Sequence, residues 1–438
     1  MIRQFGCKNI KAIKEFSEIE IRPITVIMGE NSSGKSSLLQ ALSLLTVNKM
    51  FGNDIRRIKY NNPFSNFETV DTFKDKGEDV ILTFDVVDDD SIEYRITLVY
   101  KDDNLSNEYG LLQRAEIKKV NEFHIELVQN SLEQESYKIS IRTIADTSSL
   151  LLKYKDKMEI YTNLKIITSI GLNPNSTDTD TDREDIKEDI NNIFDSANLL
   201  LSPLELLINN IASIRHISML KDVGASYDYP NDYIGYFGEK YKDIAKSLSS
   251  KAYINKCLKN IFQYEIKKID KDTGDFYLSD GNINKSLKLN MFGSSVSSTI
   301  PILTQYAKNR ETEIKDKYRL TIIEEPEINE HPLSQAKFIE SLFPKNRPKK
   351  HFNIIETHSD HIINKLRSIV SKKIIKSSDI VIYYKHKNST DTIDKNQFYK
   401  IEINKCGQFI SDEFGKGGFP KGFFDATLDE LFMLNNDC

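Results

Sequence analysis

Cysteine is scarce in this chain, and its few occurrences form no recognisable pattern. The 438 residues include four cysteines, and no two of them have C-x-x-C spacing: Cys7, Cys257, Cys406 and Cys438. Neither a zinc site nor a disulfide framework is therefore predicted. We expect a reducing, cytoplasmic location.

Long apolar runs are missing as well. The longest one, 197–208, is interrupted by Ser202, Pro203 and Glu205, which excludes a membrane-spanning helix there. The opening segment, 1–14, carries basic residues without an apolar run, so it does not read as a signal peptide. No association with a membrane is expected.

The chain also has no excess of basic residues. Its 60 lysines and arginines are outnumbered by 65 acidic residues, which gives a formal net charge of -5. This balance argues against indiscriminate coating of nucleic acid. The densest basic cluster is 345–351, for which a solvated loop and a contact with a phosphate backbone both stay open. Direct binding of DNA is kept as an alternative.

The most informative segment that is present is 29–37, Gly-Glu-Asn-Ser-Ser-Gly-Lys-Ser-Ser. An apolar run at 24–28 predicts a strand before it, and helical spacing at 38–45 predicts a helix after it. In this setting, backbone N–H groups and the helix N-terminus surround phosphates, the lysine reaches the β- and γ-phosphates, and the following serine binds Mg²⁺. The sequence predicts an ATP site at Asn31, Ser32, Ser33, Gly34, Lys35, Ser36 and Ser37, with Ser36 as a magnesium ligand.

Two adjacent carboxylates follow a second predicted strand far downstream. The β-branched run 318–323 ends in Glu324 and Glu325. Phosphoryl transfer depends mainly on positioning and charge neutralisation, so one carboxylate can serve the metal while its neighbour polarises water. We assign Glu324 to magnesium and Glu325 to the attacking water. A solvated acidic turn is the alternative.

A third predicted strand, 351–355, leads into Glu356-Thr357-His358-Ser359 and then into helical spacing from Ile362. Ligands of open α/β sheets lie at the carboxyl ends of strands, so His358 is placed to contact a γ-phosphate. A helix N-terminal residue without chemistry is the alternative for this histidine.

Together these motifs resemble ABC-type AAA ATPases of the kind found in RecF, SMC-like proteins and the overcoming-lysogenization-defect (OLD) family. The likeness covers Gly29 to Ser36, the Glu-Glu-Pro-Glu run 324–327, the Glu-Thr-His-Ser run 356–359 and the ending 418–425. It implies Walker B at Glu324, a catalytic glutamate at Glu325 and a switch histidine at His358.

ABC-type ATPases work as paired heads, and each head completes its partner's site with a serine-rich signature at a helix N-terminus. The segment 292–303 fits that place, with Gly293, Ser295 and Ser297 as residues that would contact the partner's nucleotide. It departs from the family pattern at Ser295, where glycine is common, and at Ser298, where glutamine is common. A flexible loop before a helix is the alternative.

Three other places depart from the pattern. Asn329 stands where a histidine is frequent, and Lys221 stands where many relatives have arginine, so a bidentate contact there would be lost. No clear Q-loop glutamine is present, and 65–71 is the segment that could take its place.

The expected fold is α/β, a P-loop ABC-type ATPase head with an antiparallel β-lobe and a helical insertion. Lys35 and Glu324 lie about 290 residues apart, more than a P-loop core needs, so the intervening chain must carry added structure. Alternating segments from 80 to about 161 predict antiparallel strands. We divide the chain into an N-terminal ATPase half at 1–172, a helical insertion at 173–265 and a C-terminal ATPase half at 266–438. No long heptad run is present, so an SMC-type coiled coil is not expected.

OLD-type nucleases continue into a Toprim domain, which would supply a D-x-D pair. Only 80 residues follow His358, and they contain no D-x-D. Antiphage systems such as Septu and PARIS are similar in this respect, because a compact ATPase assembles with a separately encoded HNH or Toprim-like effector. The resemblance implies an ATPase that forms a homodimer or higher oligomer and regulates a separate nuclease.

Two other functions remain open at this stage. One is a RecF- or SMC-like clamp that closes on DNA when ATP binds, which steep salt dependence would reveal. The other is a nucleotide-binding scaffold with little turnover, in line with the altered signature. A transporter subunit is disfavoured, because Glu-Glu-Pro-Glu replaces the usual aspartate-glutamate pair.

Overall fold

Two sheets of different construction organise the chain in the computed structural model. The structure describes residues 1–50, 57–59, 79–102, 109–119, 123–131, 136–143, 147–152, 203–218, 230–280, 285–311, 316–387, 397–414 and 418–420. The chain divides into two compact units. Unit 1 comprises Met1–Ile19 and Ser37–Ser213, and unit 2 comprises Glu20–Ser36 and Ile214–Cys438.

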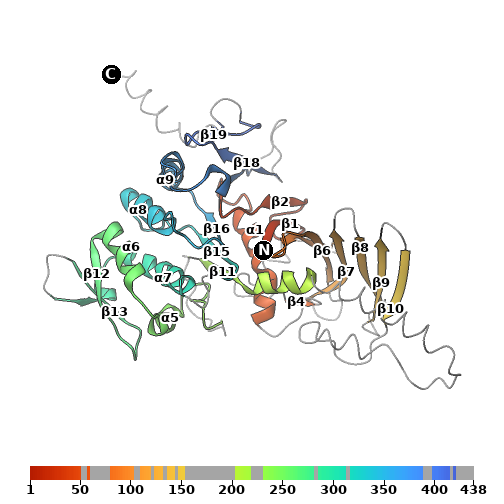
Figure 1. Cartoon of the computed structure of the whole chain (residues 1–438), viewed down its shortest axis with the longest axis horizontal. Helices are drawn as coiled ribbons and strands as arrows, with labels where there is room; N and C mark the ends of the chain where they lie inside the picture. Colours follow the sequence, from red (N-terminus) through yellow and green to blue (C-terminus); the bar gives the residue numbers. More distant parts are fainter. Residues whose placement is uncertain are drawn as a thin grey trace. The chain divides into compact units, whose positions relative to one another are not determined.

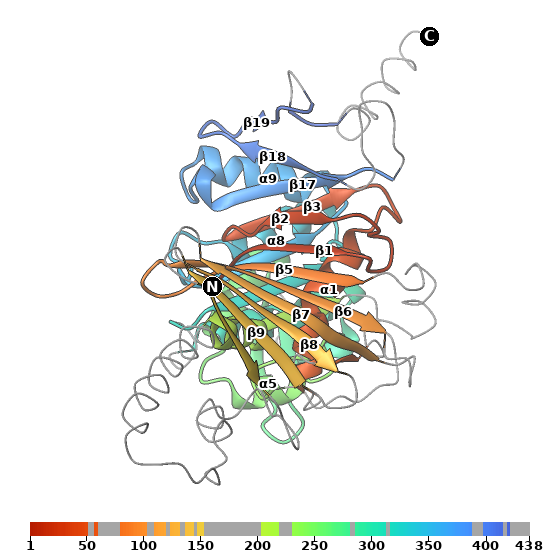
Figure 2. The ribbon, with the colours of Figure 1, turned by 90° about the vertical axis from the view of Figure 1, so that its right-hand side faces the viewer.

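Unit 1 is built on an antiparallel sheet, whose strands fan out in Figure 2. In spatial order its strands are β10 (Thr147–Leu152), β9 (Ser136–Thr143), β8 (Phe123–Ser131), β7 (Tyr109–Lys119), β6 (Glu93–Asp102), β5 (Val80–Val87), β1 (Ile2–Lys8) and β2 (Ser17–Glu20), and β4 (Arg57–Lys59) pairs with β7.

In most of these strands every second residue is apolar, and these side chains pack on one face of the sheet. Phe5 and Phe84 lie opposite each other in the β1–β5 register, with ring centroids 5.1 Å apart, and both are fully buried. The alternating segments that predicted antiparallel strands from residue 80 onward are thus confirmed as far as Leu152. Residues 203–212 of the same unit are helical.

Unit 2 contains a mixed seven-stranded sheet (Figure 1). Its order is β11 (Ile214–Ser218), β15 (Arg319–Glu324), β16 (His351–Glu356), β3 (Ile24–Gly29), β17 (Ile380–Lys385), β18 (Phe398–Ile403) and β19 (Phe409–Ile410). The first five strands run parallel and the last two pair antiparallel.

Every residue of β3, β15 and β16 is buried, as expected for strands covered on both faces. The three apolar runs that predicted these strands are therefore confirmed, and so is the α/β fold class.

Helices follow β3 and β16 where helical spacing predicts them, and other helices lie elsewhere in the chain. They are α1 (Lys35–Met50), α7 (Ser294–Asn309), α8 (Pro332–Leu342) and α9 (Asp360–Ser371), with α5 (Tyr241–Ser247), α6 (Ala252–Phe262) and the 3-10 turns η1 (Leu289–Met291) and η2 (Ser377–Asp379) between or after them. Helix α8 packs against α9 and α6, and α6 also contacts α7. A small antiparallel sheet of β12 (Tyr264–Ile269), β13 (Phe276–Asp280) and β14 (Leu287–Lys288) completes the unit.

One strand differs from the expectation. The sequence predicts a helical insertion at 173–265, yet β11 lies within that range and pairs in parallel with β15. All five of its residues are buried, including Arg215 and His216. Because these two side chains are polar, the strand does not appear as an apolar run in the sequence. Residues 173–202 of the proposed insertion lie outside the described residues.

The described helices include none that is both long and apolar enough to cross a membrane.

Candidate nucleotide site

The loop between β3 and α1 has the backbone that its glycines predict. Gly29 has φ +142°, and a Cβ placed there would lie 2.1 Å from the Lys385 carbonyl oxygen, so no larger residue fits. Gly34, with φ +103°, turns the chain directly into α1. The loop is therefore held against β17 on one side and opens a helix on the other, which is the geometry of a phosphate-binding turn.

Lys35 is the first residue of α1 and is only 4% exposed. Its Nζ donates hydrogen bonds to the carbonyl oxygens of Gly29 (3.2 Å) and Glu30 (2.8 Å), which places the ammonium group over the loop. Burial lowers the pKa of Lys35, and the charges of Glu356, Glu325, Glu30 and Glu327 oppose that shift. These carboxylates keep a positive charge favourable at the position where phosphates would be bound.

Ser36 contacts a carboxylate that lies 320 positions later in the sequence. Its hydroxyl donates a hydrogen bond of 2.9 Å to Oε1 of Glu356, the last residue of β16. The two residues meet because β16 is the direct parallel neighbour of β3, with Glu356 level with Ile27. Burial raises the pKa of Glu356, and the nearby charge of Glu324 raises it further.

Glu324 is the last residue of β15 and is buried. Its Oε1 lies 2.9 Å from Nε2 of His216 on β11, and its Oε2 accepts a hydrogen bond of 3.1 Å from the Tyr236 hydroxyl. Burial alone would raise the pKa of Glu324, but His216 and the hydrogen bonds from Ser218 and Tyr236 outweigh it and lower the pKa. The assignment of Glu324 to magnesium stays a prediction, since each of its oxygens has one hydrogen-bond partner and keeps a further lone pair.

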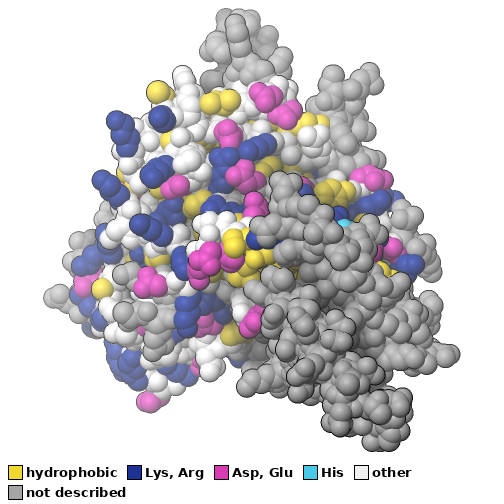
Figure 3. Space-filling model, turned by 45° about the vertical axis from the view of Figure 1, so that its right-hand side comes forward, with side chains coloured by type: hydrophobic (Ala, Val, Ile, Leu, Met, Phe, Trp, Pro, Cys, Tyr) yellow, Lys and Arg dark blue, Asp and Glu magenta, His cyan; other side chains and the backbone are white. Residues whose placement is uncertain are grey.

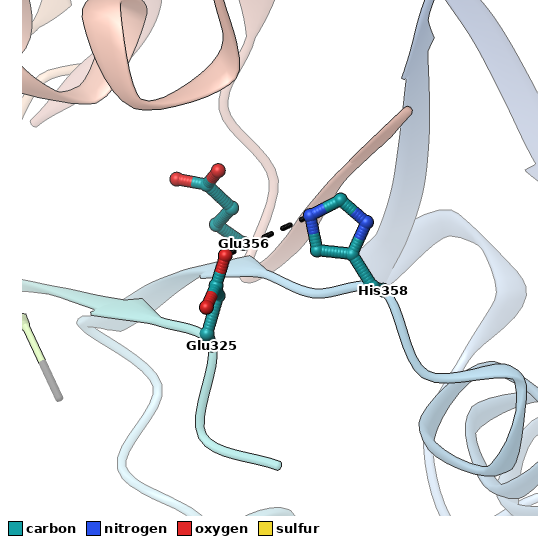
Figure 4. Close-up of side chains that lie close together, drawn as sticks. All are labelled: Glu325, Glu356 and His358. Carbon is teal, nitrogen blue, oxygen red and sulfur yellow. Dashed lines mark ion pairs between the residues drawn. The ribbon is translucent and has the colours of Figure 1, made fainter. Parts of the chain in front are cut away.

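Glu325 lies just beyond β15 in a left-handed conformation, with φ +44°. Its N–H donates to the Glu356 carbonyl oxygen at 2.8 Å, so the chain turns sharply and presents the side chain at the end of the sheet. Oε1 of Glu325 lies 3.7 Å from Nε2 of His358, which Figure 4 shows as a dashed line. Both side chains are one-third exposed and open to solvent.

A hydrogen bond from its backbone N–H fixes the position of His358. Its N–H donates to Oε1 of Glu327 at 2.6 Å, and the next residue, Ser359, caps α9 by accepting from the Ile362 N–H. Burial and then the charge of Lys35 lower the pKa of His358, so its imidazole is neutral at pH 7.

Three of these groups could share a metal ion. One carboxylate oxygen of Glu325, one of Glu356 and one ring nitrogen of His358 lie within 4.8 Å of one another, as Figure 4 shows in close-up. Carboxylate oxygens are the ligands that Mg²⁺ prefers, and the Ser36 hydroxyl stands directly beside Glu356. The donor set at the end of β16 therefore fits a magnesium ion.

Comparison with known proteins also indicates an ATPase. A family model described as "AAA ATPase domain" matches residues 1–363, most of the chain. The chain belongs to the AAA ATPase domain family. No curated relative matches its sequence.

Among solved structures, this AAA ATPase is similar to an SMC head domain from Thermotoga maritima, with 11% identity, 92% of this chain and 99% of that chain covered, and a TM-score of 0.39. It is also similar to an SMC head domain with an extended coiled coil bound to the C-terminal domain of ScpA, derived from Pyrococcus furiosus, with 9% identity, 92% and 96% coverage and a TM-score of 0.38. Because these scores are low, the family assignment rests on the family model.

The predicted signature segment of this AAA ATPase lies at the start of α7. Gly293 is the N-cap residue, and nothing lies within 4 Å of a Cβ built on it. Within the segment, the Ser297 N–H donates to the Gly293 carbonyl oxygen and the Ser298 hydroxyl donates to that of Ser295, while the Thr299 hydroxyl donates to Glu330.

The basic cluster at 345–351 joins α8 to β16. Arg347 pairs with Asp379 at 2.8 Å, so part of the cluster's charge is neutralised within unit 2. Figure 3 shows lysine and arginine side chains interspersed with acidic ones over the described part of the face that it draws. This mixture resembles an ordinary solvated surface more than a single basic patch.

Sequence reasoning missed Glu356 and His216 as site residues. The signal for Glu356 was present, since it directly precedes the Thr-His-Ser run at the end of a predicted strand. Three segments singled out by the sequence lie outside the described residues: the Q-loop candidate 65–71, Lys221, and the tail from 421 onward.

Proposed function

We propose that this AAA ATPase binds ATP with magnesium at the loop that follows β3 and hydrolyses it. The observation that carries the proposal is the convergence of Lys35, Ser36, Glu325 and His358 at the carboxyl ends of the adjacent parallel strands β3, β16 and β15. Parallel α/β sheets bind their ligands at this edge. The match of the AAA ATPase family to residues 1–363 supports the same activity.

Each residue has a task that its surroundings favour. Asn31, Ser32, Ser33, Gly34 and Ser37 would hold the phosphates through their backbone N–H groups, and Lys35 would neutralise the charge of the β- and γ-phosphates. Ser36 would bind magnesium, which neutralises charge on the same phosphates.

Glu325 and His358 would act where the terminal phosphate is attacked. Glu325 is one-third exposed, whereas Glu356 is buried, so Glu325 would orient the attacking water. His358, neutral and held by Glu327, would donate a hydrogen bond to the γ-phosphate and so distinguish ATP from ADP.

We further propose that two copies pair when ATP is bound. Gly293, Ser295 and Ser297 sit at an uncrowded helix N-terminus, where backbone N–H groups and hydroxyls suit a phosphate of a second copy. Pairing of this kind would make head closure depend on the nucleotide, as in ABC-type ATPases that this chain resembles.

The cellular role that we propose is regulation of a separately encoded nuclease in antiphage defence. Among the residues that the structure describes, the one group of carboxylates and histidines close enough to hold a metal lies in the ATP site itself. A nuclease centre would then belong to another chain, of HNH or Toprim type. The alternative is an ATP-dependent DNA clamp of the RecF or SMC kind.

Affinity purification of the tagged chain from its native cells distinguishes these roles. The eluate would be examined by mass spectrometry and tested for plasmid cleavage, and Lys35→Ala would serve as the nucleotide-free control. A stoichiometric nuclease partner, with cleavage that the ATPase alone lacks, supports the defence role. Bound DNA with repair proteins supports the clamp, and release of no phosphate from ATP by the purified wild-type chain or its complex overturns the ATPase proposal.

A further inference from the structure

A cavity lies at the amino-terminal end of β16, at the other end of this strand from the candidate nucleotide site. It is lined by His351, the first residue of β16, by the C-terminal part of α7 and by residues that follow α8. Its empty volume is about 310 Å³, including the open space at its mouth. A strand rises about 3.3 Å per residue, so the two ends of β16 lie roughly 17 Å apart. The cavity is therefore separate from the place proposed for ATP.

Basic side chains from two separate elements line this cavity. Arg310 is the C-cap residue of α7, and Arg347 lies on the connection between α8 and β16. The described residues that line the cavity include neither aspartate nor glutamate. Because both guanidinium groups stay charged at any physiological pH, the cavity favours an anion.

The guanidinium group of Arg310 is held over an aromatic ring but keeps hydrogen-bond donors. Its Cζ lies 4.5 Å from the centroid of the Tyr253 ring. This contact engages the face of the guanidinium group and leaves the N–H groups, which lie in its plane, for an acceptor. Nε is buried, and no acceptor among the described residues reaches it. A positive charge at the end of α7 suits the helix dipole, but the dipole does not supply the acceptor that this buried donor lacks.

Arg347 is fixed by an ion pair. Its Nη2 lies 2.8 Å from Oδ2 of Asp379, and its side chain is 14% exposed. A guanidinium group has five N–H donors, so this single contact orients Arg347 and leaves donors for a second acceptor.

The amide oxygens in the lining accept from other side chains. Oδ1 of Asn353 accepts from the Tyr306 hydroxyl at 2.6 Å, and Oδ1 of Asn309 accepts from Nε2 of Gln305 at 3.0 Å. The arginine donors of the cavity and its amide acceptors are thus not matched to each other. An acceptor that enters from solvent would complete the hydrogen bonding of the arginines.

We infer that this cavity binds a small oxyanion of the phosphate type, to which Arg310 and Arg347 donate. Guanidinium groups bind phosphate through paired N–H donors, and the oxygens of a tetrahedral anion point in several directions. Such an anion can therefore accept from two arginines of different elements at once. The volume is at the lower end of small-molecule sites, roughly 300–1,000 Å³, so inorganic phosphate or the phosphate group of a small monoester suits it better than a whole nucleotide. This inference goes beyond the proposed function and does not depend on it.

The test measures phosphate binding in a chain whose loop at 29–37 is disabled. Inorganic phosphate is titrated by isothermal calorimetry, in EDTA and at constant ionic strength, into the full chain carrying Lys35→Ala. Arg310→Gln, Arg347→Gln and Arg367→Gln are compared in this background. Arg367 is the matched control, because its Cζ lies 4.4 Å from the Phe409 ring while its Nε donates to the Gly407 carbonyl oxygen at 2.8 Å, away from the cavity.

We expect saturable binding with a dissociation constant of about 1 mM or lower, from two charge-assisted contacts. Arg310→Gln and Arg347→Gln should each weaken it at least about tenfold, and Arg367→Gln should stay within about twofold. Three results would overturn the inference: no saturable binding at about 10 mM phosphate, ten times the expected constant; unchanged affinity in Arg310→Gln; or an equal loss in Arg367→Gln.

Two further measurements keep the test decisive. If Arg310→Gln does not fold, as judged by circular dichroism and melting, Arg310→Lys replaces it; lysine keeps the charge but not the planar fork, so affinity should fall at least about threefold, and an unchanged affinity overturns the inference. Competition with ribose 5-phosphate and acetate identifies the source of the anion. Tighter binding of ribose 5-phosphate than of phosphate indicates a monoester, weaker binding indicates free phosphate, and acetate that binds more tightly than both overturns the phosphate class.

Discussion

Glu325 and His358 come from neighbouring strands and lie with Oε1 and Nε2 3.7 Å apart, each one-third exposed. The two residues are 33 positions apart in the sequence but meet because β15 and β16 are in register, with Glu324 opposite Glu356. The register brings a carboxylate that can orient water next to an imidazole that can contact phosphate. A nucleotide's terminal phosphate would be recognised and attacked at one place.

Replacement of Glu325 by glutamine should block hydrolysis while nucleotide stays bound. The amide keeps the size of the side chain but cannot polarise water, so we expect phosphate release to fall at least about 100-fold. Phosphate release and retention of radiolabelled ATP measure the two effects. Glu340→Gln, an exposed glutamate of α8 that pairs with Lys365, is the matched control and should keep wild-type turnover. Undiminished turnover in Glu325→Gln would refute the assigned role.

His358→Gln should lower turnover roughly 10- to 100-fold, because a positioned hydrogen-bond donor at the γ-phosphate is lost or displaced. Affinity for ADP should change little, since the imidazole is assigned to the phosphate that ADP lacks. Mant-nucleotide titrations with ADP and a non-hydrolysable ATP analogue test this difference. His361→Gln changes an exposed histidine in the first turn of α9 and should have no effect. A loss of ADP affinity equal to that for the ATP analogue would contradict the role in sensing.

Gly293→Ala should weaken the pairing of two copies without changing the stability of the fold. An added Cβ meets nothing within 4 Å in the isolated chain, and φ is -60°, so the melting temperature should change by no more than about 2 °C. At a paired interface the methyl group would obstruct close approach of a phosphate, and ATP-dependent dimerisation should weaken at least tenfold.

Sedimentation velocity with ATP, in the Glu325→Gln background, measures this pairing. Ser298→Ala is the control within the same segment, because its hydroxyl already donates to the Ser295 carbonyl oxygen of its own helix. Dimerisation that is unaffected by Gly293→Ala would place the interface elsewhere.

Glu330 should make stability depend on pH. Burial raises its pKa to about 7 from the ordinary 4.5; its Oε1 accepts from the Thr299 hydroxyl at 2.6 Å, and Oε2 has no donor among the described residues. The folded state therefore keeps a proton that the unfolded chain has lost. This contribution is fully present below pH 4.5, declines between pH 4.5 and 7, and is gone above pH 7.

Glu330→Gln keeps the acceptor for Thr299 and removes the charge, so it should stabilise the chain above pH 7 by about 1–3 kcal/mol relative to the wild type. The difference in melting temperature should shrink as the pH is lowered from 7 to 4.5. Thermal unfolding across that range, with Glu340→Gln as control, measures it. A difference that grows toward low pH would have the wrong sign for a raised carboxyl pKa.

The local parts of the site could be predicted from the sequence because short-range rules govern them. The glycines at 29 and 34 permit positive φ, the apolar run at 24–28 forms a buried strand, and Ser359 caps the helix that it precedes. The antiparallel strands of unit 1 follow from alternation of period two. Each of these outcomes depends on residues within a few positions of one another.

Only the tertiary structure decided which distant residues meet. The strand order puts β16 between β15 and β3, and Glu356 therefore receives the hydroxyl of Ser36 across 320 positions of sequence. The same order gives β11 a place beside β15, so that His216 and Tyr236 engage Glu324. The sequence by itself determined the phosphate loop and the strand-end carboxylates, because neighbouring residues set their backbone. Which carboxylate faces the loop depends on the order and register of the strands, and these arise from long-range packing that no local pattern encodes.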